Sequence, residues 1–303
     1  MKIMVTGGAG FIGSHLTDRL INEGHHVMTL DDFSTGNHDF VNPKAELAEV
    51  DITDADKVSN AFELFKPEAV FHLAAMIDLR ASLDNSEQFH KVNVVGSQNV
   101  IKASKDSGVK KIVFASSAAV YGDNQNLPIK ESEPVASDTP YGEQKAEIEQ
   151  LLKESGIKSV ILRFANVYGP RQGTVGEGGV IAIFCKRLIS YEPIKIFGDG
   201  LQSRDFIFVD DIVSANVSVL DSNKQFSIYN VSTAKETTVN EVAKKLLTIS
   251  DKNAKVEHLD AIKDEVLYNS LDNRLIKQEL GWEPLVGLEE GLKRTFTWFK
   301  NFQ

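Results

Sequence analysis

Short apolar runs alternate with longer amphipathic segments over the first 165 residues of the chain. The apolar runs, rich in Val, Ile, Phe and Leu, predict strands at Lys2–Thr6, His26–Leu30, Glu46–Val50, Ala69–Leu73, Lys111–Ala115 and Ser159–Arg163. Apolar residues at three- and four-residue spacing predict helices at Phe11–Asn22, Asp54–Phe65, Ser86–Ser107 and Pro140–Glu154. Strands and helices in alternation predict an α/β fold with a doubly wound parallel sheet of the Rossmann type.

The pattern changes after residue 165, where turn signals and glycines become frequent. One helix and two strands are predicted there, at Val180–Ile189, Ile194–Phe197 and Asp205–Val209. Residues 238–303 mix short helices with loops and end in an aromatic-rich helix. We therefore expect one domain of residues 1–165 with a returning segment of about 205–232, and a smaller mixed α/β domain of residues 166–204 and 233–303.

Composition excludes several classes of protein. The net charge is −10 and the chain holds no Lys/Arg-rich run, so it is a poor candidate for binding nucleic acid. Cys185 is the only cysteine, which excludes a disulfide within the chain and a zinc site built on cysteines. No apolar stretch approaches the ~18 residues of a membrane span, and the start of the chain does not resemble a signal peptide. We expect a cytoplasmic protein with neither a nucleic-acid nor a membrane partner, and no metal site, because the histidines lack metal-binding spacing.

A glycine-rich loop follows the first predicted strand and opens the first predicted helix. Gly7, Gly10 and Gly13 satisfy G-x-x-G-x-x-G, a pattern that lets the backbone approach a pyrophosphate at the helix N-terminus. Asp31 follows Gly13 by 18 residues, where a carboxylate binds the ribose hydroxyls of adenosine. Because the 2′-phosphate of NADP would face Asp31 and Asp32, the pattern predicts NAD as the cofactor.

Tyr141 and Lys145 form a Y-x-x-x-K motif directly after the helix-start signal Thr139-Pro140. Residues four apart share a helix face, so the ammonium can favour the phenolate and make the tyrosine a general base. Ser116 and Ser117 follow the fifth predicted strand, where a hydroxyl can bond a substrate or cap a turn.

Taken together, these motifs resemble the extended short-chain dehydrogenase/reductases, and among them the NAD-dependent nucleotide-sugar epimerase/dehydratase family. The resemblance covers nearly the whole chain and is closest to the 4-epimerases of UDP-glucose or UDP-N-acetylglucosamine. It includes further matching stretches at Asp51-Ile52, His72-Leu73-Ala74-Ala75, Asn93, Phe114–Gly122, Arg163–Pro170, Ile196–Asp211 and Leu280–Pro284.

The resemblance implies roles for individual residues. Tyr141 would be the catalytic base, Lys145 would bind the nicotinamide ribose and lower the pKa of Tyr141, and Ser117 would bond the sugar 4-hydroxyl. The residues expected to bind NAD are Gly7, Gly10, Phe11, Ile12, Gly13, Asp31, Asp32, Ser34, Thr35, Gly36, Asp51, Ile52, Leu73, Ala74, Ala75, Asn93, Ser116, Tyr141 and Lys145. The residues expected to bind the sugar nucleotide are Ser117, Tyr141, Asn166, Gly179, Val180, Lys195, Phe197, Arg204 and Asn269.

The resemblance also bears on the reaction. Related dehydratases carry Asp-Glu directly after the catalytic hydroxyl residue and UDP-glucuronate decarboxylases keep a Glu there, whereas this chain has Ala118 and Ala119. The implied reaction is NAD-dependent 4-epimerisation of a UDP-hexose through a transient 4-keto sugar. Asn269 falls at the position that controls access for an N-acetyl group, next to Tyr268, so we expect UDP-GlcNAc/UDP-GalNAc to be accepted alongside or in preference to UDP-Glc/UDP-Gal.

Two other functions stay open: a UDP-glucuronate 4-epimerase, and a non-enzymatic NAD-sensing regulator on the same fold. The family usually carries a second diphosphate arginine where this chain has Ile262, and Lys263 and Arg274 are its candidate substitutes. The outer faces of the helices predicted at Ser86–Ser107 and Pro140–Glu154 are expected to form the four-helix interface of a homodimer.

Overall fold

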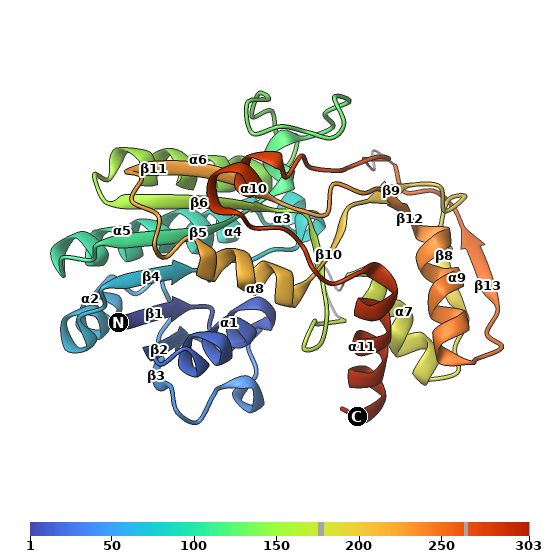
Figure 1. Cartoon of the computed structure of the whole chain (residues 1–303), viewed down its shortest axis with the longest axis horizontal. Coiled ribbons are helices and arrows are strands. Elements are labelled where there is room, and N and C mark those ends of the chain that lie inside the picture. The colour runs from blue at the N-terminus through green and yellow to red at the C-terminus, as the bar shows by residue number, and fades with distance from the viewer. Residues whose placement is uncertain (175–178, 264–265, 303) are drawn as a thin grey trace. The chain divides into compact units, whose positions relative to one another are not determined.

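The computed structural model describes residues 1–174, 179–263 and 266–302 (Figure 1). Seven parallel strands form one sheet in the order β11–β6–β5–β4–β1–β2–β3. Their bounds are Lys2–Thr6 (β1), His26–Asp31 (β2), Glu46–Glu49 (β3), Ala69–His72 (β4), Lys111–Ser117 (β5), Lys158–Phe164 (β6) and Phe226–Val231 (β11). The doubly wound Rossmann-type sheet predicted from the sequence is confirmed.

The strand order reverses between β1 and β4. Strands β1 to β3 proceed toward one edge of the sheet, and β4 to β6 proceed toward the other. Thr6 and His72, the last residues of β1 and β4, are paired in register at this reversal. Ligands of doubly wound sheets bind outside the carboxyl ends of the strands at such a point.

One face of the sheet is covered by α2 (Ala55–Phe65), α5 (Gly96–Asp106) and α6 (Pro140–Glu154), and α5 packs against both other helices. An apolar core lies between these helices and the strands. Alternate strand residues such as Met4 face this core. Since successive strand residues point to opposite faces, buried Ile3 faces the other side, where α1 (Phe11–Asn22) contacts β1 and β2.

Several segments differ from the predicted elements. The helix expected at Ser86–Ser107 forms as α4 (Ser86–His90), a π-helical turn at Lys91–Val95, and α5. The strand expected at Asp205–Val209 is shorter, because β10 covers Phe206–Phe208 and α8 (Val209–Ser218) begins at its predicted last residue. Strand β11 lies in the expected returning segment, although the pattern did not predict it.

The chain forms two compact units. The first comprises Met1–Gly122, Pro134–Arg163 and Val213–Tyr229, and the second comprises Asp123–Glu133, Phe164–Ile212 and Asn230–Gln303.

In the second unit, α7 (Val180–Ile189), α9 (Val239–Ser250) and α11 (Leu288–Asn301) pack against one another. Its strands form three pairs: β7 (Asn166–Tyr168) with β10, β9 (Ser203–Arg204) with β12 (Thr237–Thr238), and β8 (Ile194–Phe197) with β13 (Val256–Leu259). The shorter helices are α3 (Leu79–Asp84) in the first unit and α10 (Arg274–Leu280) in the second. The expected division at residue 165, between an NAD-binding part and a part that binds the sugar nucleotide, remains a prediction.

Candidate active site

Two glycines of the segment that connects β1 to α1, Gly7 and Gly13, have no room for a side chain. Gly7 has a φ of +69°, and a Cβ there would lie 2.8 Å from the backbone nitrogen of Ala74. A Cβ on Gly13 would lie 2.1 Å from the carbonyl oxygen of Gly7. Gly10 is the N-cap of α1, which has no side-chain cap and no acidic residue in its first turn. The N–H groups at the start of a helix attract anions, so the backbone at Phe11 and Ile12 suits a diphosphate.

Asp31 ends β2 with a buried carboxylate beside this loop. Its Oδ2 accepts the N–H of Ala9 and its Oδ1 accepts the N–H of Phe33, each at 2.9 Å. Burial raises the pKa of Asp31, and the two N–H groups oppose that effect. A Cβ on Gly36 would lie 2.6 Å from Oδ1 of Asp31, so the backbone encloses the carboxylate expected to bind ribose.

The other residues expected around the adenosine occupy several turns. Asp32, which is exposed, accepts both the N–H and the hydroxyl of Ser34, at 3.0 and 2.7 Å. Thr35 and Asp51 are also exposed, while Ile52 is 5% exposed and packs against Gly96. Half-buried Leu73, Ala74 and Ala75 follow β4.

A chain of buried hydrogen bonds runs behind the ends of β1 and β4. Oγ1 of Thr6 accepts the N–H of Ala74 at 3.2 Å and lies 2.7 Å from Nδ1 of His72. Nε2 of His72 lies 2.8 Å from Oγ of Ser97, which donates to the carbonyl oxygen of Asn93. Asn93 lies in the π-helical turn, and its side-chain amide exchanges two hydrogen bonds with the backbone of Met76 and donates one to Gln144 on α6.

Helix α6 begins as the sequence predicted. Oγ1 of Thr139 accepts the N–H of Gly142 at 3.3 Å, and Pro140 takes the first helical position. Gly142 was missed by the sequence analysis: a Cβ there would lie 2.4 Å from the carbonyl oxygen of Ala119. A glycine inside a helix lowers the stability of the helix. Its presence at this position was therefore the available signal in the sequence that the helix approaches another backbone closely. The approach brings α6 against the 3₁₀ turn η3 (Ala118–Tyr121) that follows Ser117.

Tyr141 and Lys145 lie together on α6, both nearly buried. The Nζ of Lys145 is 5.7 Å from the ring centre of Tyr141 and 4.7 Å from that of Phe114. It donates to the carbonyl oxygen of Ala115 on β5 at 2.7 Å. Burial lowers the pKa of Lys145 to about 7, against the opposing effect of Glu149. The predicted pair of phenol and amine is thus brought together.

The two serines at the end of β5 have different partners. Oγ of Ser117 accepts the N–H of Ala119 at 3.2 Å, so its hydroxyl caps the turn and keeps a hydrogen to donate. Ser116 is 3% exposed and donates to Glu149 at 2.6 Å. Glu149 is the second residue that the sequence analysis missed, although it continues the four-residue spacing of Tyr141 and Lys145.

The second unit carries most of the residues expected to bind the sugar nucleotide. Asn166 is exposed at the start of β7, and Gly179 and Val180 form the start of α7. Lys195 and Phe197 lie on the exposed face of β8, opposite the buried Ile194 and Ile196. Nη1 of Arg204 donates to the carbonyl oxygens of Ser203 and Leu267, at 2.8 and 3.3 Å, which brings the segment that contains Asn269 beside β9.

Arg274, one candidate for the second diphosphate arginine, is held by a carboxylate. Its Nε lies 3.0 and 2.9 Å from the two carboxylate oxygens of Asp272, and its Nη2 lies 2.5 Å from Oδ2. This pairing raises the pKa of Arg274 and lowers that of Asp272.

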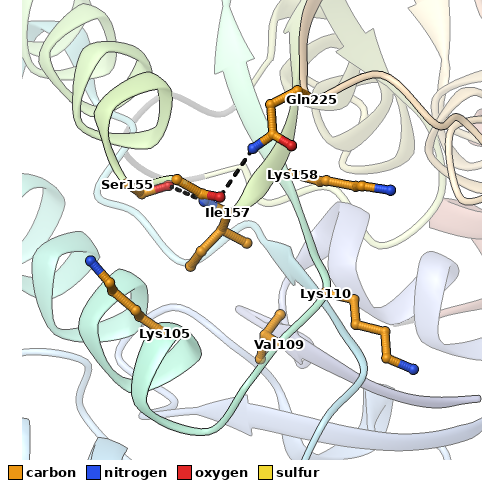
Figure 2. A pocket seen from close by; sticks show the side chains of 8 residues that line it. Lys105, Val109, Lys110, Ser155, Ile157, Lys158 and Gln225 are labelled. Carbon is orange, nitrogen blue, oxygen red and sulfur yellow. Dashed lines mark hydrogen bonds between the residues drawn. The ribbon is translucent and has the colours of Figure 1, made fainter.

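A hollow of about 450 Å³ lies in the first unit away from these residues (Figure 2). Its lining comes from the C-terminal ends of α5 and α6 and the starts of β5 and β6, with Lys105, Lys110 and Lys158 around it. It therefore lies at the end of the sheet opposite the glycine loop and Ser117.

The model of the NAD dependent epimerase/dehydratase family matches residues 3–232, well over half of the chain. The chain belongs to this family. A putative UDP-glucose 4-epimerase of Methanocaldococcus jannaschii is 40% identical over 314 residues, covering 99% of this chain and 98% of that protein. The resemblance expected from the motifs is confirmed.

Solved structures of the epimerase/dehydratase family agree with this assignment. The UDP-glucose 4-epimerase of Thermotoga maritima, solved with UDP-glucose, is 40% identical with a TM-score of 0.97 and covers 100% of this chain and 99% of its own. The UDP-glucose 4-epimerase of Thermus thermophilus, solved with NAD, is 34% identical with a TM-score of 0.94 and covers 99% of each chain. The UDP-N-acetylglucosamine 4-epimerase of Methanobrevibacter ruminantium, in complex with UDP-N-acetylmuramic acid, is 33% identical with a TM-score of 0.94 and covers 100% of this chain and 99% of its own.

NAD is the cofactor of this epimerase/dehydratase, and the residues present fit it. The uncapped start of α1 suits the diphosphate, and the carboxylate of Asp31 lies where a ribose is expected.

Cys185 is fully buried, and burial raises the pKa of its thiol to about 12, which agrees with a packing role. Among the residues that the structure describes, no cluster of metal-binding side chains and no helix able to cross a membrane is found.

Proposed function

We propose that the protein is an isomerase that interconverts a UDP-hexose and its 4-epimer with NAD. The observation that carries this proposal is the turn after Ser117, where Ala118 and Ala119 stand on η3. Neither methyl group can move a proton, so elimination of water and decarboxylation lack the acid–base residue that they need at this place. Oxidation and re-reduction at one carbon need only the residues that are present, and the named activities of the similar proteins described above support the same reaction.

NAD, when bound, supplies the acceptor for the hydride from C4 of the sugar and its return. In this proposal Tyr141 removes the proton of the 4-hydroxyl, and Ser117 donates its remaining hydrogen to the same oxygen. Lys145 binds the nicotinamide ribose and stabilises the phenolate by its charge. The 4-keto sugar must then rotate so that its opposite face receives the returning hydride. Tyr141 gives the proton back to the oxygen at C4 in the same step.

The sugar class rests on Asn269 in the second unit. Asn269 is 8% exposed, whereas Tyr268 is 45% exposed. The Oδ1 of Asn269 is buried and has no hydrogen-bond partner among the described residues. A buried oxygen without a partner suits a ligand N–H, such as that of an acetamido group. We therefore infer that UDP-GlcNAc and UDP-GalNAc are substrates, alongside or in preference to UDP-Glc and UDP-Gal.

Incubation of the purified protein with UDP-Glc, UDP-GlcNAc and UDP-GlcA, one at a time, tests the proposal. The 4-epimers are distinguished by proton NMR, because H4 changes between axial and equatorial. We expect conversion of UDP-GlcNAc to UDP-GalNAc. Conversion of UDP-GlcA alone would replace the proposed substrate by a uronate, and conversion of none of them would refute the proposed reaction.

We also propose that the protein is a homodimer in solution through the outer faces of the helical segment of residues 86–107 (α4, the π-helical turn and α5) and of α6. The molar mass measured by light scattering after gel filtration should be about twice the 33.5 kDa of one chain. A mass of one chain at micromolar concentration would refute the proposed dimer.

A further inference from the structure

A buried ion pair joins α6 to β6 in the first unit. Glu149 is 6% exposed and Arg163 is 2% exposed. Nε of Arg163 donates to Oε1 of Glu149 at 2.9 Å, and Nη2 donates to Oε2 at 2.6 Å, so guanidinium and carboxylate meet through two parallel bonds. Burial acts to lower the pKa of Arg163, but the bond to Glu149 outweighs it and raises that pKa, so the guanidinium stays charged.

The remaining bonds of the pair reach both sides of Ser117. Oε1 of Glu149 lies 2.6 Å from Oγ of Ser116, and because a carboxylate only accepts, the Ser116 hydroxyl is the donor. Nη1 of Arg163 donates to the phenolic oxygen of Tyr121 at 2.8 Å. Ser116 directly precedes Ser117, and Tyr121 ends the turn η3 that follows it.

Helix α6 therefore holds β5 at two successive residues. Lys145 bonds the carbonyl oxygen of Ala115, and one turn later Glu149 bonds the side chain of Ser116. Since residues four apart share a helix face, Tyr141 lies on the same face, one turn before Lys145. The end of β5 and the catalytic face of α6 are thus fixed to each other by two bonds.

Stability alone is a poor explanation for this pair. The desolvation of two buried charges offsets most of their attraction, and apolar residues of similar volume often give equal or greater stability. Two packed apolar side chains would hold α6 on β6 as well. They would not bond Ser116 and Tyr121, the residues on either side of Ser117.

We propose that Glu149, oriented by Arg163, is a positioning residue that fixes Ser116 and thereby sets Ser117 against Tyr141 for proton transfer. This inference rests on the proposed function, because it takes the roles of Ser117 and Tyr141 from it. A misplacement of about 1 Å can cost about 100-fold in rate. Loss of this arrangement should therefore lower kcat rather than raise KM.

Two variants and a control test the proposal in the full-length protein. Ser116→Ala removes one hydroxyl and keeps the ion pair, and the double variant Glu149→Met/Arg163→Met removes both charges and leaves none unpaired. Lys111→Met is the control, because Lys111 is a buried cation at the start of the same strand. We expect kcat to fall about tenfold or more in Ser116→Ala and in the double variant, with KM changed less than about threefold. The control should keep its kcat. Wild-type kcat in a folded double variant, or a change confined to KM, would overturn the proposal.

Hydrogen exchange without substrate supplies a readout that does not depend on activity. The peptide of residues 114–121 should exchange faster in Ser116→Ala and in the double variant than in the wild type and Lys111→Met. Unchanged exchange would overturn the positioning role even where kcat falls. If the wild type converts no UDP-sugar, the proposed function fails, and exchange still decides whether Glu149 fixes the end of β5.

Discussion

His72 donates its Nε2–H to the Oγ of Ser97, and this contact fixes the tautomer of a fully buried histidine. Ser97 uses its own hydrogen for the carbonyl oxygen of Asn93, so it accepts from His72. Nδ1 must then accept the hydrogen of the Thr6 hydroxyl, which itself accepts the N–H of Ala74. Each donor in this series of hydrogen bonds has one acceptor. A second proton on His72 would occupy Nδ1 and remove the acceptor that the Thr6 hydroxyl uses.

The first prediction concerns acid stability. Burial, with a smaller contribution from Lys145, lowers the pKa of His72 to about 3. Between that value and the unfolded value near 6.5, the unfolded chain binds a proton that the native protein does not, so stability falls as pH falls, by about 1.4 kcal/mol per unit. From about pH 7 to about pH 5, urea unfolding should show about 2 kcal/mol more loss in the wild type than in His72→Gln. Equal losses in the two proteins would contradict the neutral tautomer.

Removal of the proposed base should abolish most of the activity. Tyr141→Phe deletes one oxygen from α6 and leaves its packing, so the protein should stay folded by circular dichroism. General acid–base groups typically supply about 10²–10⁴-fold in rate, and the loss in kcat should fall in that range. Turnover of the variant at the wild-type rate would exclude Tyr141 as the base.

The buried carboxylate at the end of β2 should select the cofactor. The 2′-phosphate of NADP would meet Asp31, whose oxygens already accept two backbone N–H groups, and the exposed Asp32. Calorimetric titration of the apoprotein should give an affinity for NAD at least about tenfold above that for NADP, or about 1.4 kcal/mol. Equal affinities would show that these carboxylates do not face the ribose.

The buried amine of Lys111 should matter for stability and not for catalysis. Its Nζ donates to the carbonyl oxygens of Val219 and Ser222, at 2.9 and 2.7 Å, and to that of Leu220. These carbonyls follow the end of α8. Lys111→Met leaves them without a donor and should lower the free energy of unfolding by about 1–3 kcal/mol. An unchanged free energy of unfolding in urea would show that these hydrogen bonds of Lys111 do not stabilise the protein.

Asn269 should decide the sugar preference. Asn269→Tyr adds a ring where we infer that the N-acetyl group lies, so kcat/KM for UDP-GlcNAc should fall relative to that for UDP-Glc. One methylene-sized misfit changes such ratios by about 10–200-fold, and an aromatic ring should do at least as much. Tyr268→Phe, at the neighbouring exposed position, is the matched control and should leave the ratio unchanged. If Asn269→Tyr leaves the ratio unchanged, this residue does not control access.

How far the sequence determines the fold differs between elements. The bounds of α1 and α6 were predicted to the residue, because a glycine loop and Thr139-Pro140 mark where the helices begin. The π-helical turn at Lys91–Val95 was not predicted, since one widened turn hardly disturbs apolar spacing along the chain. Strand β11 is also hard to predict, because an edge position of the sheet depends on partners far away in sequence.

The same contrast holds for the candidate site. Motifs identified Tyr141, Lys145 and Ser117 because their chemistry is tied to short spacings. The buried ion pair of Glu149 and Arg163 was not predicted, because charged residues are normally exposed and these two become buried only when α6 packs over β5 and β6. The partners of His72 were not predicted for the same reason, being drawn from separate elements.

The contact between Gly142 and Ala119 has a consequence for anyone who engineers this protein. Replacement of a helical glycine by alanine is a common route to heat resistance, and helix propensity alone favours it by about 1 kcal/mol. Here the added methyl group would push α6 away from the turn that follows Ser117, since it would meet a carbonyl oxygen at 2.4 Å. A screen that selects for melting temperature should therefore leave Gly142 unchanged, because the residue with the lowest helix propensity keeps α6 close to the turn that carries the proposed site beside Ser117.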